Sequence, residues 1–350
     1  MKKILFRADG NASIGAGHIM RCLSIGEAAR ELGLECAYVT ADPSFEKVIQ
    51  DRGFSCMVMN TLYSDMDSEW AVLEPVLSKY QPDAVFIDSY YVTPDYLKRL
   101  RTYGKTIYLD DVLAFAYPVG VLINYNIYAD RRDYEALYSG EHGAMPRLLL
   151  GTGYVPLRKE FRRSEIPPVR ARMEHVLVSV GGADPERMAL KFLNSFVQDK
   201  ELAGRFQFHF ILNSLEPDRE EIREIAARHS WIFLHENVRC MSELMLKCDA
   251  AISAAGSTLY ELSACGVPAI TYVLADNQIP GALGFAAGGI MVNAGDCRTK
   301  PDFLAGVCRE LKLLAADSQR REDMSRKGRK TADGTGAERI VREVKDGKNF

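Results

Sequence analysis

The chain has 350 residues, which is more than one ordinary hydrophobic core holds, so two α/β domains of roughly 150 residues each are expected. Its formal net charge is −3, and the basic surplus of a nucleic-acid-binding protein is absent. No apolar run approaches the roughly 18 residues that span a bilayer, and the N-terminus lacks the apolar stretch of about 7–15 residues of a signal peptide. We therefore expect a cytoplasmic monomer with no nucleic-acid partner and no stable membrane insertion.

The eight cysteines are scattered along the chain and include no C-x-x-C pair. Zinc sites are usually built from such paired spacings, and disulfides are rare in proteins without a secretion signal. The cysteines are therefore expected to be reduced thiols. We expect neither a metal nor any other cofactor.

Strand and helix patterns alternate through the first half of the chain. After the strand KILFRA, a helix from His18 to Leu32 is expected to end at Gly33, a favourable residue after a helix C-terminus. Helices are also predicted at 44–53, 68–80 and 94–103. Further strands are predicted at ECAYVTA, SCMVMN, DAVFIDSY, KTIYLDD and GVLINYN. This alternation indicates a parallel, doubly wound sheet, and we assign residues 1–155 to an N-terminal Rossmann-like domain.

A segment rich in Gly, Pro and Arg follows, and we place a linker at 156–170. The alternation then restarts with HVLVSVGG and continues through a second Rossmann-like domain, residues 171–334, before a C-terminal helix at 335–350. Two such domains describe the GT-B architecture, in which the two parallel sheets face a central cleft. Ligands of open α/β sheets bind outside the carboxyl ends of the strands, so we expect the site at this cleft.

The first candidate site is the segment RADGNASIGAGHIMRC, in which a strand leads through Gly15 and Gly17 to His18 at the start of a helix. Glycines permit positive φ and close approach of a ligand to the backbone, and a helix N-terminus favours phosphate or a developing anion. The same field disfavours an imidazolium, so His18 is expected to stay neutral, as a general base must. The alternative is that His18 is a polar capping residue beside a structural turn. A G-x-G-x-x-G motif is absent, which argues against a dinucleotide oxidoreductase.

The second candidate site is SVGGADP, where Gly181 and Gly182 follow a buried strand and could cradle a diphosphate. Asp184 precedes Pro185, a favourable first helical residue, and is expected to be the N-cap of a helix over 185–198. An ordinary turn between a strand and a helix is the alternative.

The third candidate site is ISAAGSTLYELSACGVP, where Gly256 precedes a helix opened by Ser257 and Thr258. Glu261 lies one turn later on the same side, where its carboxylate could accept hydrogen bonds from ribose hydroxyls of a nucleotide whose diphosphate binds at the helix start. The alternative is an N-cap Ser257 with Glu261 as its capping partner. Asn277 and Gln278 follow the next strand and add amides at the same edge.

Polar and aromatic residues also end the predicted strands of the first domain. They are Asp88, Tyr90, Asp110, Asp111, Asn124 and Asn126. Such residues either face a ligand or cap the turns that follow, and the sequence leaves both interpretations open.

Taken in order, eight segments resemble the UDP-2,4-diacetamido-2,4,6-trideoxy-β-L-altropyranose hydrolases of pseudaminic acid synthesis and the related spore-coat polysaccharide proteins. They are RADGNASIGAGHIMRC, FIDSYYV, YLDD, LINYN, YVPLRKEF, SVGGADP, AAGSTLYEL and NQ. The first is the most specific, whereas AGSTLYEL is similar to GT-B enzymes more widely. The resemblance implies a metal-independent UDP-sugar hydrolase that releases UDP and the free sugar, with His18 as general base and Glu261 on the ribose.

The substrate-binding residues that this comparison and the motifs indicate fall in both domains. They are Asp9, Gly15, Gly17, Arg21, Asp88, Tyr90, Asn124 and Arg158 in the first, and Gly181, Gly182, Asp184, Arg187, Gly256, Ser257, Thr258, Glu261, Asn277 and Gln278 in the second. Two alternatives remain: a GT-B glycosyltransferase that moves the sugar from UDP to an acceptor, and a non-catalytic nucleotide-sugar binding module. A transferase with a lipid acceptor would need an apolar or basic patch on the first domain, and no such cluster is evident in residues 50–80.

Overall fold

The computed structural model describes all residues except 12, 140–143, 163–164, 183, 213–215 and 347–350. The chain divides into two compact units: unit 1 comprises Met1–Lys159 and Thr335–Phe350, and unit 2 comprises Glu160–Gly334. The C-terminal helix therefore returns to the unit in which the chain begins.

Unit 1 is built on a seven-stranded sheet whose described strand pairs are all parallel. In spatial order the strands are β3 (Ser55–Val58), β2 (Glu35–Thr40), β1 (Lys3–Ala8), β4 (Ala84–Asp88), β5 (Lys105–Leu109), β6 (Val121–Asn124) and β7 (Arg147–Leu150). The central strands are buried along their whole length, as expected for a parallel sheet covered on both faces.

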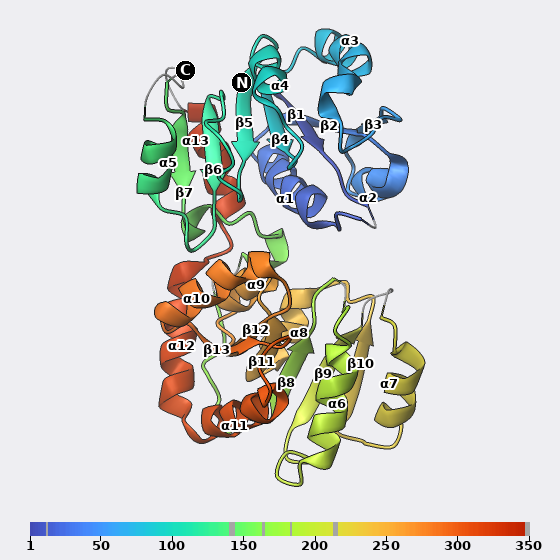
Figure 1. The fold of residues 1–350 in the computed structure, drawn as a ribbon, viewed down its shortest axis with the longest axis vertical. Helices are drawn as coiled ribbons and strands as arrows, with labels where there is room; N and C mark the ends of the chain where they lie inside the picture. Colours follow the sequence, from blue (N-terminus) through green and yellow to red (C-terminus); the bar gives the residue numbers. More distant parts are fainter. Residues whose placement is uncertain (12, 140–143, 163–164, 183, 213–215, 347–350) are drawn as a thin grey trace. The chain divides into compact units, whose positions relative to one another are not determined.

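Helices cover both faces of this sheet (Figure 1). One buried cluster joins the sheet to α1 (Gly17–Glu31), α2 (Glu46–Asp51) and α13 (Gly336–Asp346). Another joins its opposite face to α3 (Trp70–Tyr80), α4 (Pro94–Leu100) and α5 (Arg131–Leu137). Short 3-10 helices lie at η1 (Pro43–Phe45), η2 (Met66–Glu69) and η3 (Thr152–Tyr154), and η4 (Lys159–Phe161) lies where the chain enters unit 2. Because α13 packs on α1, the end of the chain supports the helix that carries His18.

Unit 2 is built on a six-stranded parallel sheet. In spatial order its strands are β10 (Ile232–Glu236), β9 (Gln207–Leu212), β8 (His175–Ser179), β11 (Ala250–Ala254), β12 (Ala269–Val273) and β13 (Met291–Asp296). Its helices are α6 (Met188–Gln198), α7 (Arg219–Ala226), α8 (Met241–Lys247), α9 (Thr258–Ala264), α10 (Ile279–Ala287), α11 (Phe303–Ala316) and α12 (Ser318–Thr331), with η5 (Asp276–Gln278) before α10.

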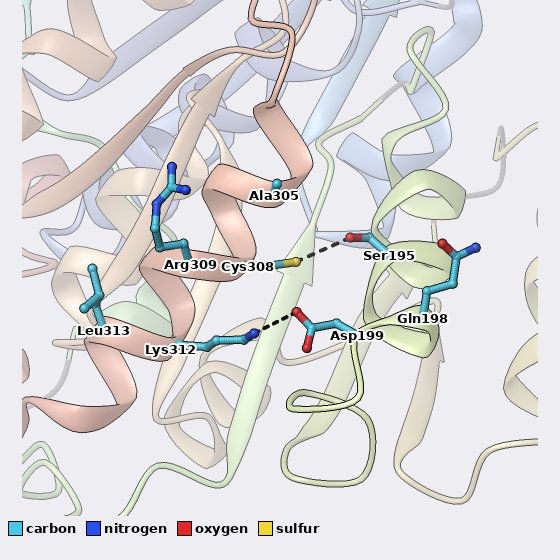
Figure 2. A pocket seen from close by; sticks show the side chains of 8 residues that line it. All are labelled: Ser195, Gln198, Asp199, Ala305, Cys308, Arg309, Lys312 and Leu313. Atoms are coloured by element: carbon cyan, nitrogen blue, oxygen red, sulfur yellow. Dashed lines mark hydrogen bonds and ion pairs between the residues drawn. The ribbon is translucent and has the colours of Figure 1, made fainter.

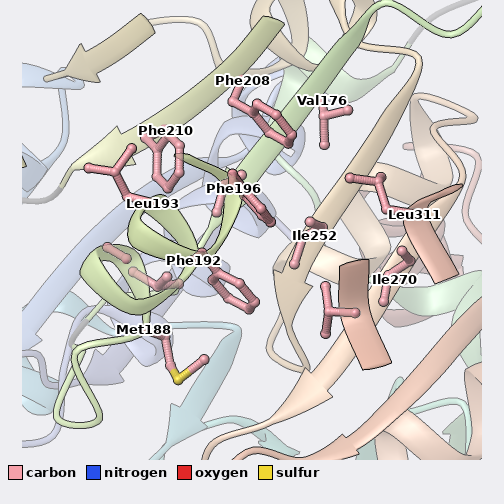
Figure 3. Close-up of a cluster of buried hydrophobic side chains, with 14 of the residues drawn as sticks. Val176, Met188, Phe192, Leu193, Phe196, Phe208, Phe210, Ile252, Ile270 and Leu311 are labelled. Carbon is pink, nitrogen blue, oxygen red and sulfur yellow. The ribbon is translucent and has the colours of Figure 1, made fainter. Parts of the chain in front are cut away.

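The main core of unit 2 lies between its sheet and the helices α6 and α11. Figure 3 shows Phe196 of α6 beside Phe208 of β9, and the two rings stack with centroids 4.3 Å apart. Burying aromatic rings of this size contributes strongly to folding, so this contact fixes α6 on the sheet.

The predicted alternation of strands and helices is confirmed, and Gly33 ends α1 with φ +79° as expected. Three elements were not predicted: α5, β7 and α10. α5 and β7 have only seven and four residues, and α10 contains a proline and two glycines, so none shows a clear periodic pattern.

Candidate active site

In both units, the strand order reverses at the place where the candidate residues lie. β1 has β2 on one side and β4 on the other, and β8 similarly lies between β9 and β11. Ligands of open parallel sheets bind at the carboxyl ends of the strands that flank such a reversal. His18 follows β1 and Asp88 ends β4, whereas Gly182 follows β8 and Gly256 follows β11.

The loop between β1 and α1 is a tight turn that presents His18. The backbones of Asn11 and Gly15 bond to each other in both directions, and Gly15 has φ +74°. The Asn11 carboxamide oxygen also accepts the backbone N–H groups of Ser13 and Ile14. α1 then begins at Gly17, so His18 is its second residue.

His18 is paired with Asp88, which the sequence named but did not connect to it. The imidazole is buried, and its Nδ1 lies 2.6 Å from Asp88 Oδ1, on a carboxylate whose side chain is fully buried. Burial alone would raise the pKa of Asp88, but the charge of Arg21 and the hydrogen bonds from Arg21 and His18 hold it well below its usual range. Arg21 Nη2 also lies 3.1 Å from Nδ1, but the shorter contact, to an ionised carboxylate, favours the proton on Nδ1. The lone pair of Nε2 is then left to accept a proton, which is the tautomer of a general base.

Arg21 lies one turn after His18 on α1 and joins two carboxylates. Its guanidinium donates to both oxygens of Asp88, and its Nη1 lies 3.1 Å from Asp111 Oδ2 and 2.8 Å from the Tyr125 hydroxyl. Burial alone would lower the pKa of Arg21, but Asp88 raises it well above its ordinary value. Arg21 therefore neutralises much of the charge of Asp88. Its role was predicted as substrate binding, but its donors are directed to residues of unit 1.

Tyr90 covers one side of His18. The two rings meet edge to face with centroids 4.7 Å apart, and the Tyr90 hydroxyl donates to Asp111 at 3.1 Å. Tyr90 is nevertheless 50% exposed. It is therefore the residue of this group that presents most surface to a ligand.

Three other predicted residues of unit 1 lie outside this group. Asp9 is buried, with its carboxylate on Arg7 and on the backbone N–H of Ala41. Asn124 is also buried, and its side chain donates to Tyr134 and accepts from Asn126. Arg158 is half-buried in the segment between η3 and η4.

Asp184 has an internal role in unit 2. Its buried carboxylate accepts the backbone N–H groups of Met188 and Ala189, each at 2.8 Å. α6 begins at Met188, so the prediction of a helix from residue 185 with Asp184 as its N-cap is wrong by three residues. The cause is Arg187, whose φ of +55° interrupts the helical path and whose guanidinium is held by Asp218. Ala183 lies outside the described residues.

The residues around α9 and η5 are more accessible. Gly256 and Ser257 are exposed, and Thr258 and Glu261 are half-buried at the start of α9. Ser257 occupies the N-cap position with helical dihedral angles and makes no side-chain capping bond. Asn277 is exposed, whereas the Gln278 carboxamide oxygen accepts the backbone N–H of Leu274 at 2.8 Å.

Five of the predicted glycines face open space. A Cβ atom built on any of them would meet no described atom within 4 Å; they are Gly15, Gly17, Gly181, Gly182 and Gly256. Gly15 and Gly181 have positive φ, which accounts for glycine there. At Gly17, Gly182 and Gly256 the φ angle is not positive, and the described residues leave open space where a side chain would lie.

A hollow in unit 2 contains none of the predicted residues. It lies between α6 and α11, where Lys312 is ion-paired with Asp199 at 2.9 Å and the Cys308 thiol lies 3.4 Å from the Ser195 hydroxyl (Figure 2). Since α6 follows β8, its C-terminal residues lie toward the amino ends of the strands. This hollow is therefore distant from the carboxyl edge of the sheet of unit 2.

Within the described part of the chain, no group of three or more His, Cys, Asp or Glu side chains is arranged to hold a metal ion. None of the described helices combines the length and the apolar character needed to cross a membrane.

Comparison with known proteins links these features to nucleotide-sugar enzymes. No protein-family model matches the chain. It is 23% identical over 346 residues to the spore coat polysaccharide biosynthesis protein SpsG of Bacillus subtilis, covering 97% of this chain and 96% of that protein. It is 24% identical over 278 residues to the UDP-2,4-diacetamido-2,4,6-trideoxy-β-L-altropyranose hydrolase of Campylobacter jejuni, covering 77% of this chain and 92% of the hydrolase.

Among solved structures, MurG of Acinetobacter baumannii superposes with a TM-score of 0.69 at 14% identity, covering 99% of this chain and all of MurG. An identity this low is informative about the fold alone. The chain has the GT-B fold, and its homologues include SpsG and the UDP-diacetamido-trideoxy-altropyranose hydrolases.

Proposed function

We propose that the protein hydrolyses a UDP-linked 2,4-diacetamido-2,4,6-trideoxy sugar at its anomeric carbon, releasing UDP and the free sugar for nonulosonic (pseudaminic) acid synthesis. The observation that carries this proposal is the His18–Asp88 pair, in which Nδ1 is bound to a buried carboxylate. The similarity to an altropyranose hydrolase over 77% of this chain supports the choice of substrate.

The reaction needs one base and a stabilised leaving group. His18 Nε2 takes a proton from water while the water oxygen forms a bond to the anomeric carbon. The bond from that carbon to the β-phosphate oxygen breaks, and its electron pair leaves on UDP. General-base assistance of this kind is worth roughly 10²–10⁴ in rate. Asp88 keeps the imidazole in the required tautomer and stabilises the imidazolium that forms.

Unit 2 holds UDP in this proposal. Backbone N–H groups beside Gly182 and Gly256 approach the diphosphate, because these glycines leave space for it. Glu261 accepts hydrogen bonds from the ribose hydroxyls, and Asn277 lies exposed at the same edge of the sheet. The proposal assigns the base to unit 1 and the nucleotide to unit 2, and it requires no metal.

Release of UDP from a panel of UDP-sugars, without an acceptor, is the direct test. The wild-type protein should release UDP from the diacetamido-trideoxy donor, and activity should persist in EDTA. His18→Asn should lower kcat by about 10² or more while UDP still binds. The control variant is His229→Asn, which replaces a histidine of unit 2 that lies beside Trp231. Unchanged turnover of the His18 variant would remove His18 from the mechanism.

UDP affinity tests the role of unit 2 separately. Glu261→Ala should weaken UDP binding by roughly 1–3 kcal/mol through lost ribose hydrogen bonds. Gly256→Ala should weaken binding while leaving thermal stability close to wild type, because its new methyl group fills only the ligand space. Gly281→Ala, another glycine with no atom near its Cβ position, is the matched control. Equal UDP affinity in calorimetry for wild type and the Glu261 variant would refute the ribose assignment.

A GT-B glycosyltransferase that moves the sugar to an acceptor is the second candidate. In residues 50–80, Met57, Leu62 and Val72 are 43%, 66% and 40% exposed, and single exposed apolar side chains do not decide between transfer and hydrolysis. A transferase would release little UDP without an acceptor, and a binding module would release none. The UDP-release assay therefore separates all three functions.

A further inference from the structure

A buried ionic network lies directly beneath the loop that leads to His18. Arg7 is on β1 and fully buried; its Nε and Nη2 lie 2.9 and 2.7 Å from the two carboxylate oxygens of Glu69 in η2. The Tyr96 hydroxyl of α4 donates to the same carboxylate at 2.6 Å. Arg7 Nη1 lies 2.5 Å from Asp9 Oδ2. None of these four side chains was connected to another by the sequence.

Such a network is costly to bury. Two carboxylates and one guanidinium lose their hydration, and apolar side chains of similar size often stabilise a fold as well as a buried ion pair does. Burial alone would lower the pKa of Arg7, but Glu69 and Asp9 raise it above its ordinary value, so Arg7 is always charged. Compared with apolar side chains, the buried ionic network therefore adds a fixed hydrogen-bond geometry and not extra stability.

That geometry determines where the loop starts. Asp9 is the first residue after β1, and its other oxygen accepts the backbone N–H of Ala41, beyond the end of β2, at 2.6 Å. Gly10 follows, so tightly packed against Phe45 and Ile19 that a Cβ atom there would lie 2.9 Å from the Phe45 ring. Both carboxylate oxygens of Asp9 thus bond within unit 1. These bonds fix the direction in which the backbone leaves β1.

We propose that Arg7 and Glu69 are positioning residues for the reaction: they hold Asp9 in place, and Asp9 sets the path of the loop that places His18 against Asp88. This inference rests on the proposed function, because it assigns the chemistry to His18. It also explains why Asp9 occurs in the same motif as His18, although both of its carboxylate oxygens are bonded within unit 1.

The test replaces the buried pair with apolar side chains in the full-length protein. Arg7→Met/Glu69→Leu should fold cooperatively, bind UDP with a Kd within about twofold of wild type, and lose about tenfold or more in kcat. The matched control is Arg99→Met/Glu74→Leu, which removes a half-exposed ion pair between α4 and α3, 2.8 Å long in the wild type. This control should keep its kcat.

A second variant keeps the proposal testable if the double variant does not fold. Asp9→Asn can keep its oxygen on the backbone N–H of Ala41, but its N–H₂ group then faces Arg7 and the bond to Arg7 is lost; the variant should lower kcat with unchanged UDP affinity. Arg7→Lys keeps a positive charge opposite Asp9. Its kcat should therefore be higher than that of Arg7→Met/Glu69→Leu. Wild-type kcat in Asp9→Asn or in the double variant, or an equal loss in the control, would overturn the proposal.

Hydrogen exchange separates this outcome from failure of the proposed function. Backbone amides of residues 9–22 should exchange faster in the double variant than in the control, whether or not the protein hydrolyses UDP-sugars. A wild-type protein that releases no UDP refutes the proposed function, whereas unchanged exchange in these residues refutes the positioning role.

Discussion

The Asp88→Asn variant tests the His18–Asp88 pair, because its effects on the free energy of unfolding and on kcat can be measured separately. Asp88 is fully buried and accepts from Nε and Nη2 of Arg21, from Nδ1 of His18 and, at 3.8 Å, from the Cys22 thiol. Asparagine has the same shape but only one acceptor oxygen. Its amide N–H₂ group must therefore face a donor on Arg21 or His18.

The cost to stability follows from these contacts. Breaking a buried ion pair by removing one partner costs about 3–5 kcal/mol. Arg21 keeps a second carboxylate, because its Nη1 lies 3.1 Å from Asp111 Oδ2. We therefore expect the free energy of unfolding to fall by about 2–4 kcal/mol.

The cost to catalysis has a different origin. An asparagine can donate to Nδ1 and so place the imidazole proton on Nε2, which removes the base. We expect kcat to fall by about 10²–10⁴, with UDP affinity unchanged because the proposed function assigns UDP binding to unit 2.

Denaturant unfolding, calorimetry with UDP and the UDP-release assay give the three readouts. Asp111→Asn is the matched control, since Asp111 contacts Arg21 and Tyr90 but has no bond to His18. It should lose stability with a smaller loss of kcat. Wild-type turnover in Asp88→Asn, when His18→Asn is inactive, would refute the idea that Asp88 orients His18.

Three further predictions concern stability alone. Burial and the charge of Asp184 raise the pKa of Glu216 to about 7, so its folded state keeps a proton that the unfolded state has lost, and stability should fall as pH rises from about 4.5 to 7. Glu216→Gln should abolish this dependence in denaturant titrations. Burial, with His235 and His175 nearby, lowers the pKa of His209 to about 4, so the unfolded state binds more protons and stability should fall by up to about 3 kcal/mol as pH drops from 6.5 to 4. An unchanged acid slope in His209→Leu would contradict this. Gly26→Ala should cost about 1–3 kcal/mol in thermal unfolding, because its Cβ would overlap the hydroxyl of a buried tyrosine.

Much of the fold is readable in the sequence because its signals are local. A strand such as Ala84–Asp88 is apolar up to its last residue, and helix α1 ends at a glycine whose positive φ other residues adopt reluctantly. Local signals also made His18 a candidate, because this histidine lies at a helix start directly after a segment with two glycines. Such signals failed for α10, whose helix forms by packing despite a composition that disfavours helices.

The pairing of His18 with Asp88 could not be predicted, because 70 residues separate them and only the strand order places β4 beside β1. The same applies to Asp9 and Asp184, two motif carboxylates that bind backbone N–H groups of their own unit. The sequence by itself determined the parallel α/β architecture and predicted which residues are candidates for the chemistry. Only the tertiary structure decided which carboxylate is paired with His18 and which holds a loop, because a carboxylate's contacts depend on the donors that surround it in space.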